Sequence, residues 1–333
     1  MFISRVSSTK SNTNGFKTRF ILFTTFLFLV YFFSNNLIYS QAEKKSDGDY
    51  LVPMGNVLQI DAQLKHIIVR NTCEDSPFLV GDSILKINKT SIDCYGDFSN
   101  VLSTLKPNDK VNVLICRSGN DYSISTTKDI LEKINLNSLI SGFATLTYIR
   151  PETNEFGAVG HPINIGCSKK IFIKKGCIST TQNLTIEKSC KGSVGSINGT
   201  KKDTIGEFNQ NTNFGIKGKI SNLDVSNYKK YKIASLDEVK TGKAHIILQN
   251  ATGKCEKFEI EILSIENQRS PEPKTFKIRI LDKNLMLLTG GIVQGMSGTP
   301  IVQGDKIIGA VSHAVENDPS TGYGVFIQWM LNN

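Results

Sequence analysis

A mainly β fold in three parts is predicted by three features of the 333-residue sequence. An apolar stretch follows basic residues at the N-terminus, and a first block combines short strands with a short helix. From Gly142 onward, many short strand-like runs are separated by turn residues. Many short strands with few helices are typical of β-barrels. Apolar residues make up 39% of the chain, which suffices for an ordinary core and argues against global disorder.

Residues 1–42 are predicted to be a signal peptide or a membrane anchor. Basic residues precede the apolar run 20–33, which continues with interruptions to Tyr39. This run is shorter than the about 20 residues that a spanning helix needs, whereas the whole stretch to Tyr39 is just long enough. Small residues at 40–42 suit cleavage of a signal peptide. Both alternatives stay open, and in both of them the basic residues place the rest of the chain outside the cytoplasm.

The composition argues against a nucleic-acid-binding or metal-binding protein. The net charge is +9, but four of the positive charges lie in residues 1–42, which contain no Asp or Glu. The densest basic run, 169–175, alternates like a strand flanked by lysines, which is typical of solvated strand ends. The seven cysteines include no C-x-x-C pair, which argues against a zinc or thioredoxin-like site. No segment resembles a phosphate loop or a nucleotide fold, so no metal and no cofactor is expected. Cys167, Cys177 and Cys190 lie close together in the sequence, either as a local disulfide or as small buried residues.

Residues 51–127 form the predicted α+β module, which a polar linker at 43–50 joins to the N-terminal stretch. Alternating apolar residues predict strands at 57–60, 66–69, 82–88 and 110–117, and a helix at 98–105.

The run Gly81–Asn88 in this module has the sequence GDSILKIN, which is similar to the Gly-Asp-x-Ile-Leu-x-Ile-Asn signature of PDZ domains. This resemblance implies a PDZ domain that binds an extended peptide end by adding a strand to its sheet. It also implies that backbone N–H groups near Gly55, Asn56 and Val57 hold the terminal carboxylate of that peptide. A β-rich module that binds no peptide is the alternative.

Residues 141–333 are predicted to form an all-β barrel or a pair of barrels, after a short helix at 128–140. Strand-like runs lie at 144–149, 170–173, 245–248, 258–265, 275–280 and 306–311. Turn pairs such as Asn198-Gly199 and Thr252-Gly253 separate them.

The strongest chemical signal is the run Gly295-Met296-Ser297-Gly298-Thr299-Pro300. A serine nucleophile must project from a tight turn whose N–H groups point at the developing oxyanion, and glycines permit such a turn. The N–H groups of Gly295 and Ser297 are the candidates for this oxyanion hole. The run resembles Gly-Asp-Ser-Gly-Gly-Pro of chymotrypsin-like proteases, which implies a double β-barrel; it does not match the G-x-S-x-G elbow of α/β-hydrolases. A glycine-rich hairpin without chemistry is the alternative.

A serine nucleophile needs a base, and two of the four histidines are candidates. His66 lies in the first module and His245 in an alternating strand, where packed or surface positions are usual. His161 lies in a loop of small residues before a proline, and His313 lies on a strand that follows the serine run. Both can approach Ser297, and the spacing favours His161 only slightly.

A carboxylate must orient the base. Asp282 lies at the end of the predicted strand 276–281, fifteen residues before the serine. Asp203, Asp224 and Asp237 compete with it, but each lies in a polar stretch that is typical of a turn.

A wider resemblance connects these segments. The PDZ-like block together with 156–163, Asp282 and 290–321 resembles the SpoIVB (stage IV sporulation protein B) serine peptidases of endospore-forming bacteria. The most specific parts are 290–298 and 309–313, followed by Asn-Asp-Pro at 317–319. The resemblance implies a triad of His161 as base, Asp282 as its partner and Ser297 as nucleophile. His313 would then be structural or line the cleft.

The resemblance also implies a biological role. Such a serine endopeptidase is exported into the intermembrane space of the forespore, either free or anchored to the inner forespore membrane. It cleaves a membrane regulatory protein and itself, which releases an intramembrane protease that processes the precursor of sigma factor K. The PDZ domain helps to recognise the target, and neither nucleic acid nor a small-molecule cofactor takes part. A catalytically inactive PDZ-containing envelope scaffold and an esterase are the alternatives.

Overall fold

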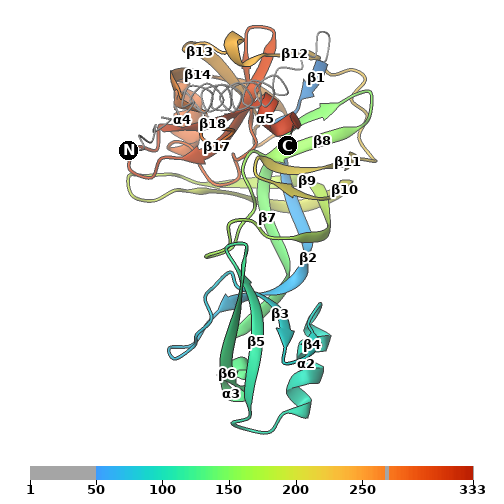
Figure 1. Cartoon of the computed structure of the whole chain (residues 1–333). Helices are drawn as coiled ribbons and strands as arrows, with labels where there is room; N and C mark the ends of the chain where they lie inside the picture. Colours follow the sequence, from blue (N-terminus) through green and yellow to red (C-terminus); the bar gives the residue numbers. More distant parts are fainter. Residues whose placement is uncertain (1–49, 267–269, 333) are drawn as a thin grey trace, which may run out of the picture. The chain divides into compact units, whose positions relative to one another are not determined.

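The computed structural model describes residues 50–266 and 270–332 (Figure 1). The predicted signal peptide or anchor at residues 1–42 lies outside the described residues. In the described part of the chain, no helix combines the length and the apolar character that crossing a membrane requires. This part is mainly β, as predicted.

The first part of the chain forms eleven strands. They are β1 (Tyr50–Pro53), β2 (Val57–Asn71), β3 (Ser83–Ile87), β4 (Thr90–Ser91), β5 (Lys110–Arg117), β6 (Asn120–Thr127), β7 (Asn135–Arg150), β8 (Glu155–Val159), β9 (Ile173–Glu187), β10 (Ser196–Thr212) and β11 (Gly215–Ile220). The second part contains β12 (Tyr231–Ile233), β13 (Gly242–Gln249), β14 (Cys255–Ile265), β15 (Phe276–Ile280), β16 (Pro300–Gln303), β17 (Lys306–Ala314) and β18 (Thr321–Phe326). The helices are α2 (Tyr95–Thr104), α3 (Lys128–Lys133), α4 (Lys283–Thr289) and α5 (Ile327–Asn332), with a 3₁₀ turn at Leu236–Glu238.

Two closed antiparallel barrels make up the larger part of the fold. In the first, pairing runs in a ring from β2 through β7, β8, β11, β10 and β9 back to β2. In the second, the ring runs from β13 through β14, β15, β18, β17 and β16 back to β13. Closure leaves no unpaired sheet edge within either ring. The predicted double β-barrel is therefore confirmed.

A small α+β module is inserted into the first barrel, between β2 and β7. It contains β3 to β6 with α2 and α3 and has a core of its own, which includes Phe78, Ile84, Phe98 and Val113. The sheet order in the module is β6, β5, β3, β2 and β7. Both long strands thus belong to the barrel at one end and to the module at the other (Figure 1).

The structure differs here from the predicted boundary at residue 51. Val52, Leu58 and Ile60 are buried in the core of the first barrel, with Phe156 and Ile178, and not in the module. In β2, buried residues alternate with partly buried ones from Leu58 to Leu64, and this alternation is interrupted at 65–69, where the barrel part ends. The break is a bulge: Gln63 faces Leu139 and Ile68 faces Asn137, so that the four residues 64–67 lie opposite one residue of β7.

A second contact joins the module to the chain segment that follows His161. The Cys167 amide donates to the Val80 carbonyl at 2.8 Å, and a Cβ on Gly81 would lie 2.1 Å from the Ile165 carbonyl oxygen. Asp82 next to it is fully buried and accepts two hydrogen bonds from Arg117, at 2.7 and 2.6 Å. The aspartate of the PDZ-like signature therefore has a structural role, because a buried carboxylate needs a charged partner.

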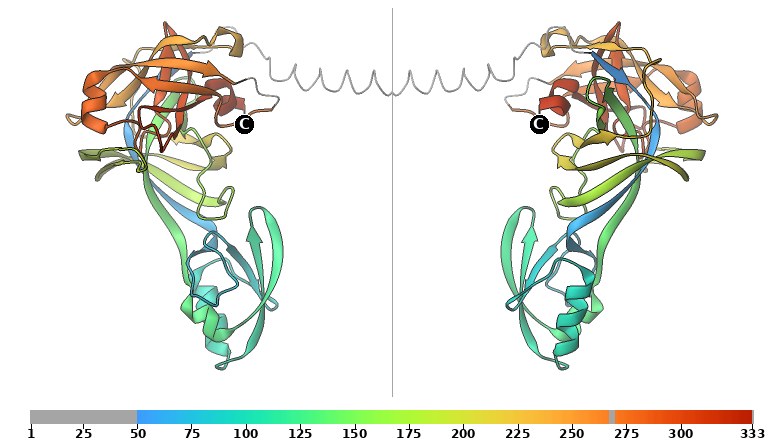
Figure 2. Two further views of the ribbon diagram at one scale, coloured as in Figure 1. Left: turned by 90° about the vertical axis from the view of Figure 1, so that its left-hand side faces the viewer. Right: turned by 90° about the vertical axis from the view of Figure 1, so that its right-hand side faces the viewer.

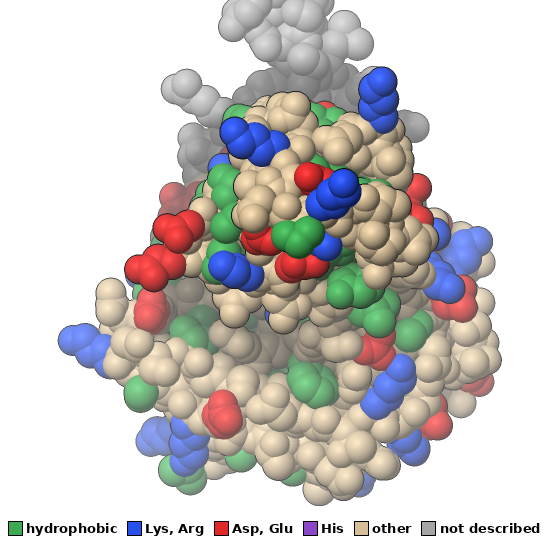
Figure 3. Space-filling view, turned by 90° about the horizontal axis from the view of Figure 1, so that it is seen from below, with side chains coloured by type: hydrophobic (Ala, Val, Ile, Leu, Met, Phe, Trp, Pro, Cys, Tyr) green, Lys and Arg blue, Asp and Glu red, His purple; other side chains and the backbone are tan. Residues whose placement is uncertain are grey.

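Charged side chains of both signs are interspersed on the face of the molecule shown in Figure 3. Basic side chains do not gather on this face into a continuous patch. All seven cysteines lie in the described part and are free thiols, so the local disulfide considered for Cys167, Cys177 and Cys190 is not formed.

Candidate active site

The predicted nucleophile and base meet between the two barrels. Ser297 lies in the turn between α4 and β16 of the second barrel, and His161 follows β8 of the first barrel. The Nε2 atom of His161 lies 3.0 Å from the Ser297 hydroxyl, and both side chains are half-buried. This is the hydrogen-bond distance that proton transfer from the hydroxyl requires.

Glycines are needed on both sides of the serine. Gly295 and Gly298 have φ angles of +98° and +94°, in the left-handed region that side chains with a Cβ rarely adopt. A Cβ on Gly298 would lie 2.3 Å from the Thr145 carbonyl oxygen and 2.4 Å from the Val159 nitrogen. The turn can therefore pack against the first barrel only with glycine at this position.

Strand β7 of the first barrel holds the serine turn in place. The Thr145 amide donates to the Ser297 carbonyl at 2.9 Å, and the Thr145 hydroxyl donates to the Gly295 carbonyl at 2.7 Å. The Thr147 hydroxyl donates to the Gly298 carbonyl at 2.7 Å. Both threonines are fully buried. Neither threonine was predicted to belong to the site, although two threonines alternating with apolar residues in a buried strand indicate hydroxyls with buried partners.

The predicted oxyanion-hole donors, the amides of Gly295 and Ser297, are available to a ligand. The amides of Met296, Gly298 and Thr299 each donate to a backbone carbonyl. Those of Gly295 and Ser297 donate no hydrogen bond to any residue that the structure describes. Two amides without a partner beside a serine hydroxyl are suited to hold the oxygen of a substrate carbonyl as it becomes negative.

The backbone is strained at the two residues that precede His161. Val159 has a φ of 80° and Gly160 one of 78°. A β-branched residue at positive φ is an outlier that the surrounding structure must enforce, and such strain clusters at functional sites. Val159 is buried and pairs with Gly215 of β11, which supplies that enforcement.

The tautomer of His161 follows from its second contact. Its Nδ1 atom lies 2.9 Å from the Pro162 carbonyl oxygen, which can only accept a hydrogen bond. Nδ1 must therefore carry the proton, and Nε2 is left as the acceptor for the Ser297 hydroxyl. Burial lowers the pKa of His161, and the Pro162 carbonyl opposes this shift. The imidazole is thus neutral at neutral pH, as a general base must be.

Asp282 is not placed as the triad resemblance implies. It is the N-cap of α4, and its carboxylate accepts from the Leu285 amide at 2.9 Å. In the described part of the chain, the hydrogen-bond partner of His161 Nδ1 is the Pro162 carbonyl and no carboxylate. The physical reason is that Asp is a favoured N-cap residue, and a helix begins directly after the strand that Asp282 was expected to end. The competing aspartates bond within their own turns, as Asp224 does with Ser226 and Asp237 with Ser235.

His313 lies beside the base. The ring centroids of His161 and His313 are 5.2 Å apart, and the Nδ1 atom of His313 is buried without a hydrogen-bond partner among the described residues. Burial, together with the nearby His161 and Lys274, lowers the pKa of His313 to about 4. His313 is therefore neutral at neutral pH and lines the site from β17.

The residues predicted to hold a peptide carboxylate lie elsewhere. The Gly55 amide donates to the Leu146 carbonyl at 2.9 Å, and Val57 pairs with Thr145 on β7. The Val57 amide also donates to the Gln249 side chain of β13 at 2.9 Å. Asn56 lies between Gly55 and Val57 in the sequence. All three belong to the first barrel, where β2 begins. The prediction was wrong because the module starts only after the bulge at 64–67.

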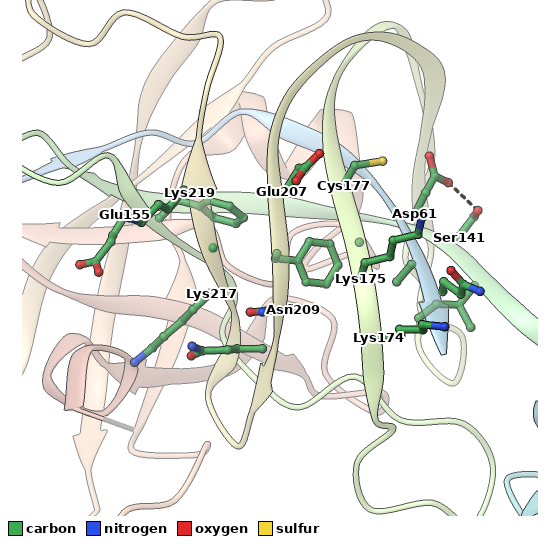
Figure 4. Close-up of a pocket in the computed structure, with 18 of the residues that line it drawn as sticks. Asp61, Ser141, Glu155, Lys174, Lys175, Cys177, Glu207, Asn209, Lys217 and Lys219 are labelled. Atoms are coloured by element: carbon green, nitrogen blue, oxygen red, sulfur yellow. Dashed lines mark hydrogen bonds between the residues drawn. The ribbon is translucent and has the colours of Figure 1, made fainter. Parts of the chain in front are cut away.

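A hollow with a volume of about 1110 Å³ lies away from this site. It lies in the first barrel and is lined by Lys174, Lys217, Glu155 and Glu207 among others, without Ser297 or His161 (Figure 4). Lys217 is already engaged there, since its ammonium donates to the Leu331 carbonyl of α5 at 3.0 Å. Among the described residues, no group of three or more His, Cys, Asp or Glu side chains is arranged to hold a metal.

His313 predicts how stability depends on pH. Its pKa is about 4 in the folded chain, against an ordinary value of 6.5. Between these two values the unfolded chain binds a proton that the folded chain does not, so the free energy of unfolding falls as the pH falls through this window. We expect His313→Gln to weaken this fall, measured by urea unfolding at several pH values between neutrality and the lower pKa. An unchanged pH dependence would contradict the neutral, buried state of His313.

Comparison with known proteins gives two family matches. A model described as SpoIVB peptidase S55 matches residues 134–331, and a PDZ domain model matches residues 43–127. Comparison with curated proteins gives no match.

Two solved structures are similar to parts of the chain. One is the Rv3671c protease in an inactive form, with 15% identity and a TM-score of 0.31, covering 57% of this chain and 81% of that one. The other is a serine-to-alanine variant of Rv3671c from M. tuberculosis H37Rv, also inactive, with 15% identity and a TM-score of 0.28, covering 56% of this chain and 76% of that one.

The family model covers more than half of the sequence and includes Ser297 and His161. The chain therefore belongs to the SpoIVB peptidase S55 family, and it is a serine peptidase with a PDZ domain.

Proposed function

We propose that this serine peptidase acts during endospore formation, in the space between the forespore and mother-cell membranes. There it cleaves a membrane regulatory protein and itself, and the cleavage releases an intramembrane protease that processes the precursor of sigma factor K. Membership of the family supports this role. The PDZ module suits a polypeptide substrate, and the apolar stretch in residues 1–42 suits export, either as a free protein or anchored to the inner forespore membrane.

The observation that carries the proposed chemistry is the 3.0 Å contact between His161 Nε2 and the Ser297 hydroxyl. A serine hydroxyl is a weak nucleophile unless an adjacent base accepts its proton. Here the base is neutral, in the required tautomer, and held by a strained backbone. The uncommitted amides of Gly295 and Ser297 lie in the same turn.

The proposed reaction follows from these contacts. Nε2 of His161 takes the hydroxyl proton as Ser297 Oγ bonds to the carbonyl carbon of the scissile peptide bond. The carbonyl oxygen becomes negative and accepts hydrogen bonds from the Gly295 and Ser297 amides. The C–N bond then breaks as His161 returns the proton to the leaving amine. Water, deprotonated by the same imidazole, hydrolyses the acyl-enzyme and regenerates Ser297.

The Pro162 carbonyl takes the part that a carboxylate plays in most such sites. It fixes the ring by accepting from Nδ1–H, and it stabilises the imidazolium through its dipole. A neutral acceptor stabilises a cation less than an ionised one does. The site therefore works as a Ser–His pair with a backbone orienting group.

An inactive envelope scaffold and an esterase are the competing functions. A scaffold would not need a base in hydrogen-bond contact with the serine, and an esterase would not need a peptide-binding module. Both features are present, which favours the endopeptidase.

We expect Ser297→Ala and His161→Ala in the full-length chain each to abolish processing of the sigma factor K precursor in sporulating cells. Losing either member of such a pair costs several orders of magnitude in the rate of peptide-bond cleavage. Ser226→Ala, which removes a hydroxyl from an exposed turn, serves as the matched control and should process normally. Immunoblots of the precursor and mass spectrometry of the peptidase itself give the readout. Normal processing by a folded Ser297→Ala protein would overturn the proposal and favour the scaffold.

Asp282→Asn separates the two roles considered for this residue. Asn is as good an N-cap as Asp, so the variant should keep α4 and lose less than about tenfold in kcat/KM. If Asp282 instead oriented His161, the same change should lower kcat by about 10⁴ by favouring the wrong tautomer. Steady-state cleavage of a peptide substrate by the two purified proteins distinguishes the outcomes.

A further inference from the structure

Strand β7 takes part in two sites at once. Its first residues, Asn135 to Asn137, pair with β2 inside the PDZ module. Its last part, Thr145 to Arg150, belongs to the first barrel, where Thr145 and Thr147 hold the serine turn. Between these two ends, β7 runs beside β2 (Figures 1 and 2).

Inside the module, β7 lies where a peptide ligand would bind. PDZ domains take an extended peptide as an added strand at the edge of their sheet, and pockets for alternate side chains give specificity. The outer edge of β2 is covered by residues 135–137 of β7, running antiparallel, and β7 in turn contacts α2. An added strand between β2 and α2 can bury side chains against the helix. At the other end of the sheet, β6 is exposed along most of its length and has no such pocket.

The side chains of this segment alternate as those of a bound peptide do. Ile134 is buried and Leu136 is partly buried, and both pack into the module core with Phe98 of α2. The alternate residues, Asn135 and Asn137, are exposed. The chain thus supplies an apolar residue at every second position, facing the groove between β2 and α2.

The attachment of this segment is separate from the attachment of the rest of β7. The bulge at 64–67 of β2 interrupts the pairing between the module part and the barrel part of the two strands. Only three residue pairs lie on the module side, Ile68 with Asn137, Val69 with Leu136 and Asn71 with Asn135. Pairing can therefore be lost on the module side while the barrel stays closed.

We propose that residues 134–137 are an internal ligand of the PDZ module, and that an extended peptide with apolar residues two positions apart displaces them. In the self-bound state β7 is in register and the Ser297–His161 contact is formed. Displacement frees the first part of β7, while the barrel part beyond the bulge stays paired with β2 from Leu139 to Thr145. The occupancy of the groove does not depend on the proposed function of Ser297.

A binding experiment tests the occupancy. The probe is a fluorescent peptide with the sequence of residues 133–139, added to the full-length chain carrying Ser297→Ala so that it is not cleaved. A tethered occupant acts like a ligand at roughly millimolar concentration, so the wild-type groove should bind the probe weakly. Leu136→Asp should vacate the groove and raise the affinity at least about tenfold, because the competent state becomes populated. Leu139→Asp is the matched control, since Leu139 is 60% exposed on the same strand and outside the groove, and it should bind like wild type.

The contradicting results are equally specific. The occupancy would be overturned if the Leu136→Asp and Leu139→Asp proteins bound the probe with equal affinity. It would also be overturned if a second probe, with Asp at positions 134 and 136, bound as tightly as the first. Leu136→Ala repeats the test with a milder change if Leu136→Asp does not fold. Hydrogen exchange at residues 135–137 of the Ser297→Ala protein gives a second readout: it should speed up when the probe is bound, because these residues lose their pairing with β2. Unchanged exchange with the probe bound would mean that the probe binds elsewhere, and it would overturn the occupancy.

Discussion

The hydrogen bonds from Thr145 and Thr147 to the serine turn are the constraint on which the site depends. The nucleophile and its base come from different barrels, and each barrel closes on itself without the other. A contact of 3.0 Å between Ser297 and His161 therefore requires that something fixes one barrel against the other. The buried threonines do this at the turn itself, and Gly298 permits it because no Cβ fits there.

The same strand explains how a binding module and a peptidase come to share one scaffold. A module attached by a flexible linker would leave the barrels unaffected by what it binds. Here the module is inserted between two paired barrel strands, and the segment after His161 also contacts it through Cys167 and Val80. Two physical connections thus run from the module to the two halves of the catalytic pair. Differential binding to the module can shift the site only through such contacts.

The sequence predicted the chemistry better than the architecture, for physical reasons. Ser297 is surrounded by glycines whose backbone role is local, so a short segment was enough to find it. The local sequence favoured His161 over His313 only slightly, and the family resemblance decided between them. The role of Asp282 could not be predicted, since a carboxylate between a strand and a short helix suits a cleft and an N-cap equally well. The Gly55–Val57 assignment failed because barrel closure and the insertion of the module depend on long-range pairing. The alternation in β2 is interrupted at 65–69, but a local interruption does not show which part of the fold each half of the strand joins.

Labelling with a fluorophosphonate tests directly whether His161 activates Ser297. A fluorophosphonate reacts with an activated serine and not with an ordinary hydroxyl, and peptide mass spectrometry locates the label. In the folded full-length chain, we expect a label on Ser297 that is lost in His161→Ala. A label on another serine, or a label on Ser297 that survives the loss of the imidazole, would contradict it.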